Sequence, residues 1–134
     1  MILVDAGPLK ALVDADDQHH AACVAAVRNL RDPLGTVWPA LTEAMYLLAD
    51  HPRAQEAIWD MLALGAIQLR PLDQDDVPRM RELMRKYTDR PMDMADAALI
   101  RVAEREGIQT IFTVDKKDFA VYRLHGRSRI TIIP

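Results

Sequence analysis

The chain has 134 residues, enough for one domain with a buried core and too few for two, so we expect a single domain over residues 1–134. No signal-type segment or long apolar span occurs, which argues against secretion or membrane insertion and for a cytoplasmic protein. The formal net charge of −3 lacks the basic excess typical of nucleic-acid binders, although two bound divalent cations would bring it to about +1. Charge therefore neither supports nor excludes a polyanionic substrate.

The first half of the chain alternates short apolar runs with segments of helical periodicity. Pro8 and Pro39 suit the first turn of a helix, where the missing N–H costs nothing, and Gly65 suits a helix C-terminus. The lone Cys23 sits among alanines and is expected to be a small buried residue rather than a reactive thiol. The predicted elements are a strand at 2–4, a helix from residue 8, a helix at 19–30, a strand at 36–38, a helix from residue 39 and a helix at 53–64.

The second half continues the alternation and defines the fold class. The predicted elements are a strand at 67–69, a helix from residue 73, a loop at 88–91, a helix at 93–106, a strand at 110–113 and a strand at 130–133. Short apolar strands that alternate with helices predict an α/β fold, in which a parallel central sheet of four to five short strands is flanked by helices. Ligands of such sheets bind beyond the carboxyl ends of the strands.

Six carboxylates stand at the edges of these apolar segments. Like charges gathered at one place repel each other and usually imply a bound cation. Each acid also has a structural alternative as a helix cap, a dipole partner or a turn residue. In particular, Asp93 and Asp96 have the spacing of an N-cap and the third residue of a helix. The six are Asp5, Glu43, Asp93, Asp96, Asp115 and Asp118.

Other polar residues near these acids are less informative. The hydroxyls of Thr42 and Thr113 could bind a metal-bound water or a phosphate. Lys116 and Lys117 fit phosphate contacts or, as the favoured interpretation, a solvated turn. The adjacent His19 and His20 point in different directions on a helix, so a zinc site is not expected.

Five segments, in order along the whole chain, resemble the PIN-domain nucleases and most closely the VapC-like toxins of toxin–antitoxin pairs. One piece alone would be weak, but all five at these separations are specific. The strongest piece ends in Asp-Met-Ala-Asp-Ala-Ala-Leu-Ile. The segments are 4–9, 17–21, 42–48, 87–100 and 111–119, with Tyr122-Arg123 beyond the last.

The resemblance implies a three-layer α/β/α domain with the activity of a Mg²⁺- or Mn²⁺-dependent endoribonuclease that uses one or two ions. By motif, the catalytic acids are Asp5, Glu43, Asp96 and Asp115, and Asp93 and Asp118 match accessory acids. Asp5, Asp96 and Asp115 would hold metal, and Glu43 would hold metal or orient water. The hypothesis is an in-line attack of water on an RNA phosphodiester that leaves a 5′-phosphate and a 3′-hydroxyl.

The same resemblance implies a cognate antitoxin protein and a homodimer. An arginine or lysine of the antitoxin could displace metal by pairing with the carboxylates. The alternative function is a catalytically silent PIN-fold binding module in an RNA-associated complex. A receiver-like phosphoacceptor domain fits poorly, because Asp5 lacks an acidic neighbour and the segment after residue 69 lacks the acceptor aspartate.

Overall fold

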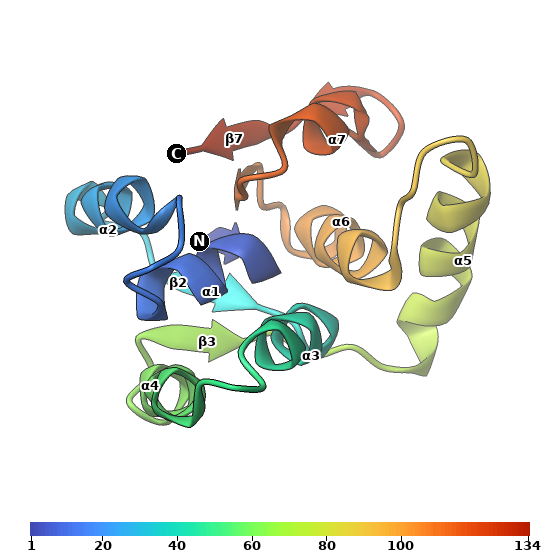
Figure 1. Cartoon of the computed structure of the whole chain (residues 1–134). Coiled ribbons are helices and arrows are strands. Elements are labelled where there is room, and N and C mark those ends of the chain that lie inside the picture. Colours follow the sequence, from blue (N-terminus) through green and yellow to red (C-terminus); the bar gives the residue numbers. More distant parts are fainter.

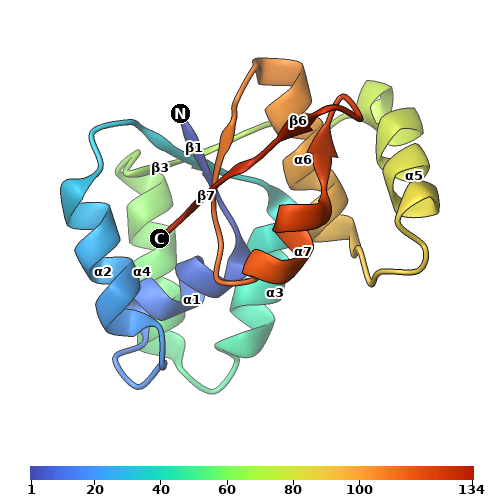
Figure 2. The same cartoon turned by 90° about the horizontal axis from the view of Figure 1, so that it is seen from above.

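The structure is a computed structural model that describes all 134 residues, and its centre is a five-stranded parallel sheet. The strand order is β3-β2-β1-β4-β7, so β1 is central and the predicted fold class is confirmed (Figures 1 and 2). The register pairs Leu3 of β1 with Gly35 of β2 and with Ile111 of β4. The strands are β1 (Ile2–Val4), β2 (Leu34–Thr36), β3 (Ile67–Leu69), β4 (Thr110–Phe112) and β7 (Thr131–Ile133).

Helices flank this sheet, and α5 lies outside α6 in both views, at the opposite side of the molecule from α2 (Figures 1 and 2). None of the helices has the length and apolar character needed to cross a membrane. A separate antiparallel hairpin follows the last helix and comprises β5 (Arg123–Leu124) and β6 (Ser128–Arg129). The helices are α1 (Ala6–Val13), α2 (His20–Asn29), α3 (Trp38–Leu47), α4 (Pro52–Ala63), the 3₁₀ turn η1 (Gln74–Asp76), α5 (Val77–Lys86), α6 (Met94–Glu106) and α7 (Lys116–Val121).

Three predicted local structures were wrong. The strand predicted at 36–38 ends at Thr36, because Pro39 fits the first turn of a helix and α3 therefore already begins at Trp38. Helix α1 begins at Ala6 rather than at Pro8, since Asp5 caps it from the position directly before. The segment from Asp115 to Asp118, interpreted as a turn, is the start of helix α7.

The core lies between the sheet and the helices. Leu3, Ile111 and Leu99 have no exposed surface, as expected for strands covered on both faces and for an apolar helix packed beside them. Cys23 is also fully buried and free, in agreement with its predicted packing role. Deleting most of the Leu99 side chain would cost about 2–5 kcal/mol in a core of this kind.

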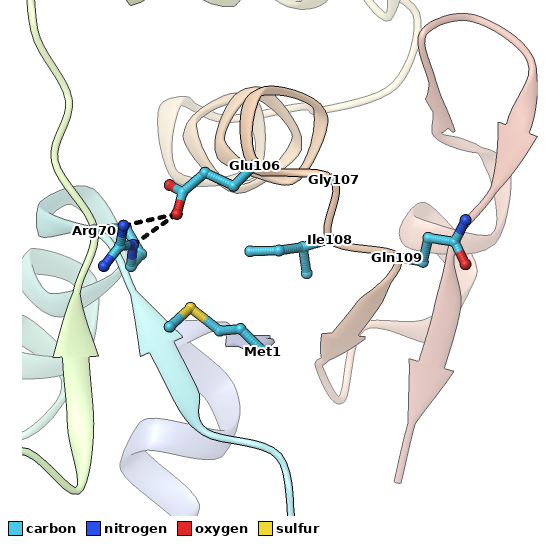
Figure 3. Close-up of a pocket in the computed structure, with 6 residues that line it drawn as sticks. All are labelled: Met1, Arg70, Glu106, Gly107, Ile108 and Gln109. Atoms are coloured by element: carbon cyan, nitrogen blue, oxygen red, sulfur yellow. Dashed lines mark hydrogen bonds and ion pairs between the residues drawn. The ribbon is translucent and has the colours of Figure 1, made fainter.

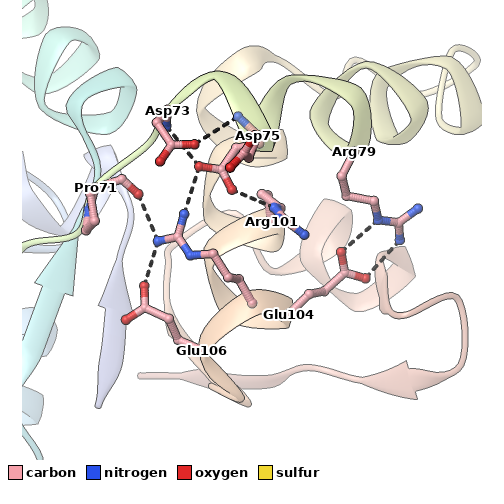
Figure 4. Close-up of polar contacts among 9 residues, drawn as sticks. Pro71, Asp73, Asp75, Arg79, Arg101, Glu104 and Glu106 are labelled. Atoms are coloured by element: carbon pink, nitrogen blue, oxygen red, sulfur yellow. Dashed lines mark hydrogen bonds and ion pairs between the residues drawn. The ribbon is translucent and has the colours of Figure 1, made fainter.

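A buried ion-pair network joins η1 to α6 (Figure 4). The Asp76 carboxylate, nearly inaccessible to solvent, accepts hydrogen bonds from Arg101 at 2.7 Å and from Arg105 at 2.8 Å. Asp73 caps η1, and its backbone N–H donates to Asp76. Burial by itself would raise the pKa of Asp76, but these hydrogen bonds and the two guanidinium groups lower it below the ordinary value.

This network predicts an acid-dependent contribution to stability. The pKa of Asp76 is lower in the folded protein than in the unfolded chain. The contribution of the Asp76 carboxylate to folding stability is therefore complete above the unfolded pKa of about 3.9 and disappears as pH falls through the folded pKa. Urea unfolding of wild type and Asp76→Asn should therefore show a large difference in free energy at neutral pH that shrinks at strongly acidic pH. A difference that does not change with pH would contradict the assigned role of the carboxylate.

Candidate active site

All six predicted acids line one cavity of about 270 Å³. They reach it from four places in the fold: the end of β1, the middle of α3, the start of α6 and the start of α7. The strands β1 and β4 are parallel neighbours, so the residues that follow them emerge at the same edge of the sheet. The acids are Asp5, Glu43, Asp93, Asp96, Asp115 and Asp118.

Asp5 is held rigidly in this cavity from two sides. Its carboxylate accepts a hydrogen bond from the backbone N–H of Ala6 at 2.8 Å, which makes it the N-cap of α1. The hydroxyl of Thr113 donates to the other oxygen at 2.9 Å and accepts from the backbone N–H of Asp115 at 3.0 Å. Through these two hydrogen bonds, Thr113, which is fully buried, links two predicted site acids. Thr42 is exposed, and its hydroxyl donates instead to the carbonyl of Trp38 in its own helix.

A glycine allows the first turn of α1 to approach the segment between β4 and α7, which carries Asp115. A Cβ at Gly7 would lie only 2.5 Å from Cγ2 of Val114, a distance that packed atoms do not reach. Gly7 and Val114 both line the cavity. The missing side chain thus lets the segments after β1 and β4 meet closely at the site.

Asp93 and Asp96 form a reciprocal capping box at the start of α6, as their spacing predicted. The Asp93 carboxylate accepts from the backbone N–H of Asp96 at 2.8 Å, and Asp96 reaches back to the N–H of Asp93 at 3.4 Å. The same oxygen of Asp96 accepts a hydrogen bond from the buried hydroxyl of Tyr122 at 3.1 Å. The capping role and a place in the cavity therefore coexist.

The carboxylates in this cavity repel one another. Burial, together with the charges of Asp93 and Asp5, raises the pKa of Asp96 to about 8. Burial also raises the pKa of Asp5, and the carboxylates of Asp93 and Asp115 act in the same direction. The pKa values of Glu43 and Asp115 are raised as well, first by burial and then by neighbouring acids. Such mutual repulsion is what a bound cation would relieve.

Comparison with known proteins gives three consistent results. Residues 2–124 match the model of the PIN domain family. Over 135 aligned residues, 99% of this chain and 100% of the relative, the chain is 30% identical to Ribonuclease VapC26 of Mycobacterium tuberculosis. The structure of M. tuberculosis VapC20, a sarcin-ricin loop cleaving toxin, superimposes with a TM-score of 0.80 at 21% identity, covering 87% of this chain and 91% of that chain.

This chain belongs to the PIN-domain family. The near-complete alignment with VapC26 makes it a VapC-like member. The fold agreement with VapC20 independently supports the three-layer α/β/α arrangement.

The acids of this PIN domain fit a hard divalent cation. All of the donors are carboxylate oxygens, which Mg²⁺ and Mn²⁺ prefer. No group of three His, Cys, Asp or Glu side chains is arranged closely enough to enclose an ion by itself. Mg²⁺ does not need such a cage, because it keeps several waters and binds through one or two carboxylates together with phosphate oxygens of a substrate. An open acidic cavity suits that mode of binding.

A second cavity, of about 360 Å³, lies beside the N-terminus of β1, whereas the acids of the PIN domain lie beyond its C-terminal end (Figure 3). Its polar groups are mainly Arg70 and Glu106, which neutralise each other in an ion pair at 2.8 Å. Ile108 and Gln109 line its other side. It therefore lacks the uncompensated charge that distinguishes the acidic cavity.

The sequence did not indicate two contacts of the site, that of Tyr122 with Asp96 and that of Arg90 with Asp118. Tyr122 appeared only as part of the family motif, and nothing local indicated that its hydroxyl would reach Asp96, 26 positions away. Arg90 lies 3.9 Å from Asp118 and is the one cation paired with an acid of the cavity. The only available signal for Tyr122 was an aromatic residue directly after a short apolar run.

Proposed function

We propose that this protein is a Mg²⁺- or Mn²⁺-dependent endoribonuclease that acts in the cytoplasm as the toxin of a toxin–antitoxin pair. The observation that carries this proposal is the gathering of six carboxylates, from four separate elements, in one open cavity. The VapC relatives support the ribonuclease assignment, since VapC26 is named a ribonuclease and VapC20 a sarcin-ricin loop cleaving toxin.

The residues of the acidic cavity have different roles in the proposed reaction. Asp5, Asp96 and Asp115 would hold one or two cations, with Asp93 and Asp118 as accessory acids. A bound cation would offset negative charge at the phosphodiester and lower the pKa of a bound water. Glu43, which reaches the cavity from α3, would orient that water for attack in line with the leaving 3′-oxygen. Thr113 and Tyr122 keep Asp5 and Asp96 in fixed positions through their hydroxyls.

The test is RNA cleavage by purified protein after removal of metal, followed by addition of Mg²⁺ or Mn²⁺. We expect no cleavage in chelator, cleavage after addition of metal, and products with 5′-phosphate and 3′-hydroxyl ends. Binding of RNA and metal without turnover would instead favour the silent binding module. Cleavage that persists unchanged in excess chelator would contradict metal dependence.

The proposed partners of this protein are a cognate antitoxin and a second copy of the same chain. A short antitoxin gene beside this one, whose product suppresses both cleavage and growth arrest, would separate a toxin from a housekeeping nuclease. A homodimer is proposed by analogy with such toxins, and light scattering of the purified protein would measure it directly. A strictly monomeric protein across the active concentration range would contradict the dimer but not the nuclease.

Removal of the Tyr122 hydroxyl should weaken metal binding without unfolding the protein. Groups that hydrogen-bond to a metal-ligating side chain typically contribute about 10–100-fold to metal affinity, so we expect a loss of that size for Tyr122→Phe. Calorimetric titration of metal-free protein with Mn²⁺ measures it.

The matched control for this substitution is Tyr87→Phe. Tyr87 packs edge-to-face against Tyr122, with ring centroids 5.0 Å apart, but its hydroxyl accepts a hydrogen bond from the backbone N–H of Arg123 instead of contacting an acid. Tyr87→Phe should keep the wild-type metal affinity. Equal metal affinities for the two variants would refute the orienting role of Tyr122.

A further inference from the structure

The charges of this protein are divided unevenly along the chain. Residues 116–134 contain five cationic side chains and one acid, a formal charge of +4, whereas residues 1–115 carry −7. A chain that is acidic overall therefore ends in a basic segment, and a basic segment of this kind is the usual electrostatic signature of contact with a polyanion. The cations are Lys116, Lys117, Arg123, Arg127 and Arg129.

The fold places the start of this segment next to the acidic cavity. Lys116 and Lys117 begin α7 directly after Asp115, which lines the cavity. Helix α7 has six residues and so extends about 9 Å from that point, after which the β5–β6 hairpin begins. That length corresponds to one or two nucleotides of an extended strand.

The hairpin is fixed against the end of α7. One guanidinium nitrogen of Arg123 donates to the last carbonyls of this helix, including that of Ala120 at 2.7 Å. Arg129 is the direct cross-strand partner of Arg123, so both side chains emerge from the same face of the hairpin. On α5, Lys86 adds a further charge: its Nζ would lie 3.6 Å from a Cβ at Gly126, in the hairpin turn.

Four of these residues form what we call the basic strip. All of them are exposed, and none of the ion pairs in the protein includes them. By contrast, Arg70, Arg79, Arg101 and Arg105 are each paired with a carboxylate. The charges of the strip are thus free to meet an external anion. The basic strip consists of Lys116, Lys117, Arg127 and Arg129.

We propose that the basic strip binds the phosphate backbone of RNA on one side of the scissile phosphodiester. This inference rests on the proposed ribonuclease function and extends it to substrate recognition. The acidic cavity by itself repels the phosphates that neighbour the one being cleaved, so a substrate strand needs cations immediately outside the cavity. Lys116 and Lys117 supply them at the edge of the cavity, and Arg127 and Arg129 supply them farther out, in the hairpin after α7. Contacts of this kind hold RNA without reading its sequence.

The test compares two double variants with equal changes of charge. Arg127→Gln with Arg129→Gln removes two charges of the strip. Arg28→Gln with Arg31→Gln removes two exposed, unpaired arginines from α2 and the loop after it, and α2 stands apart from β6 in Figure 2. Both pairs are introduced into Asp96→Asn protein, and the binding of a fluorescent single-stranded RNA oligomer is measured by anisotropy over a range of salt concentrations.

We expect the strip variant to bind the oligomer about tenfold more weakly at moderate salt and to lose about 1.4 from the slope of log affinity against log salt, since each contact to a single strand contributes about 0.7. The control pair should keep the affinity and slope of its parent. With Asp96 restored, the strip variant should show a raised KM for long RNA but an unchanged rate on a dinucleotide too short to reach the hairpin.

The outcomes separate this inference from the proposed function. If wild-type protein cleaves RNA but the two double variants bind it equally, the strip is not an RNA contact and the nuclease assignment stands. If the strip variant alone binds weakly while wild type never cleaves, the strip is confirmed and the nuclease assignment fails. An acidic protein partner on the strip would leave RNA affinity unchanged and would equally overturn the inference.

Discussion

Asp96→Asn should abolish RNA cleavage. Asp96 lies at the start of α6 among the other acids of the cavity, and the substitution removes a carboxylate proposed to hold metal without changing the size of the side chain. We expect a fall in the cleavage rate of at least about 100-fold, because loss of a direct ligand should cost more than the 10–100-fold typical of an outer partner. The measurement is initial cleavage rate at saturating Mg²⁺.

The fold of this variant provides the essential control. In chelator, Asp96→Asn should unfold at the same temperature as wild type or at a higher one, since burial and neighbouring acids disfavour the charge that it removes. Addition of Mn²⁺ should raise the unfolding temperature of wild type more than that of the variant. Asp89→Asn, an exposed aspartate in the nearby loop and outside the cavity, should cleave normally. Full cleavage by Asp96→Asn would exclude Asp96 from the site.

Glu104→Gln should destabilise the protein by about 3–5 kcal/mol, the usual cost of breaking a buried ion pair from one side. The Glu104 carboxylate is 2% exposed and accepts two hydrogen bonds from Arg79, both at 2.8 Å (Figure 4). It also accepts from the backbone N–H of His125, so it anchors the β5–β6 hairpin to α6. Urea unfolding at neutral pH measures the change in free energy.

The chain offers a matched control for this prediction. Glu82 pairs with the same guanidinium at 3.0 Å, but its side chain is 69% exposed. Glu82→Gln should therefore change the free energy of unfolding by less than about 1 kcal/mol. If both substitutions had the same small effect, the ion pair of Glu104 would not be structurally important.

Helix α6 illustrates how acids of the site differ from acids of the scaffold. Near its C-terminal end, Glu104 and Glu106 are each paired with arginine, and the pKa of each is lowered despite its burial. At its N-terminal end, Asp96 faces other acids and its pKa is raised. The kind of neighbour, and not burial or position on a helix, therefore separates a candidate cation site from structural carboxylates.

The sequence predicted the order of strands and helices well because short apolar runs and capping residues act locally. The Asp93–Asp96 capping box and the positions of β1, β3 and β4 follow from such local patterns. The boundary between β2 and α3 was wrong, because Val37 and Trp38 favour a strand locally while Pro39 permits a helix to start before it. The short helix α7 was missed for a different reason, because six residues carry too little periodicity to distinguish a helix from a turn.

The sequence by itself determined the family, through five motifs, and with it the six candidate acids. Only the tertiary structure decided that these acids share one cavity, because Asp5 and Asp115 are 110 positions apart and meet only where parallel strands end side by side. It also decided the roles of Thr113 and Tyr122, whose hydroxyls contact acids distant in sequence. The local sequence pattern indicates which secondary structure a segment prefers. Charge repulsion and hydrogen bonding between segments depend instead on distances that exist only after the sheet has formed.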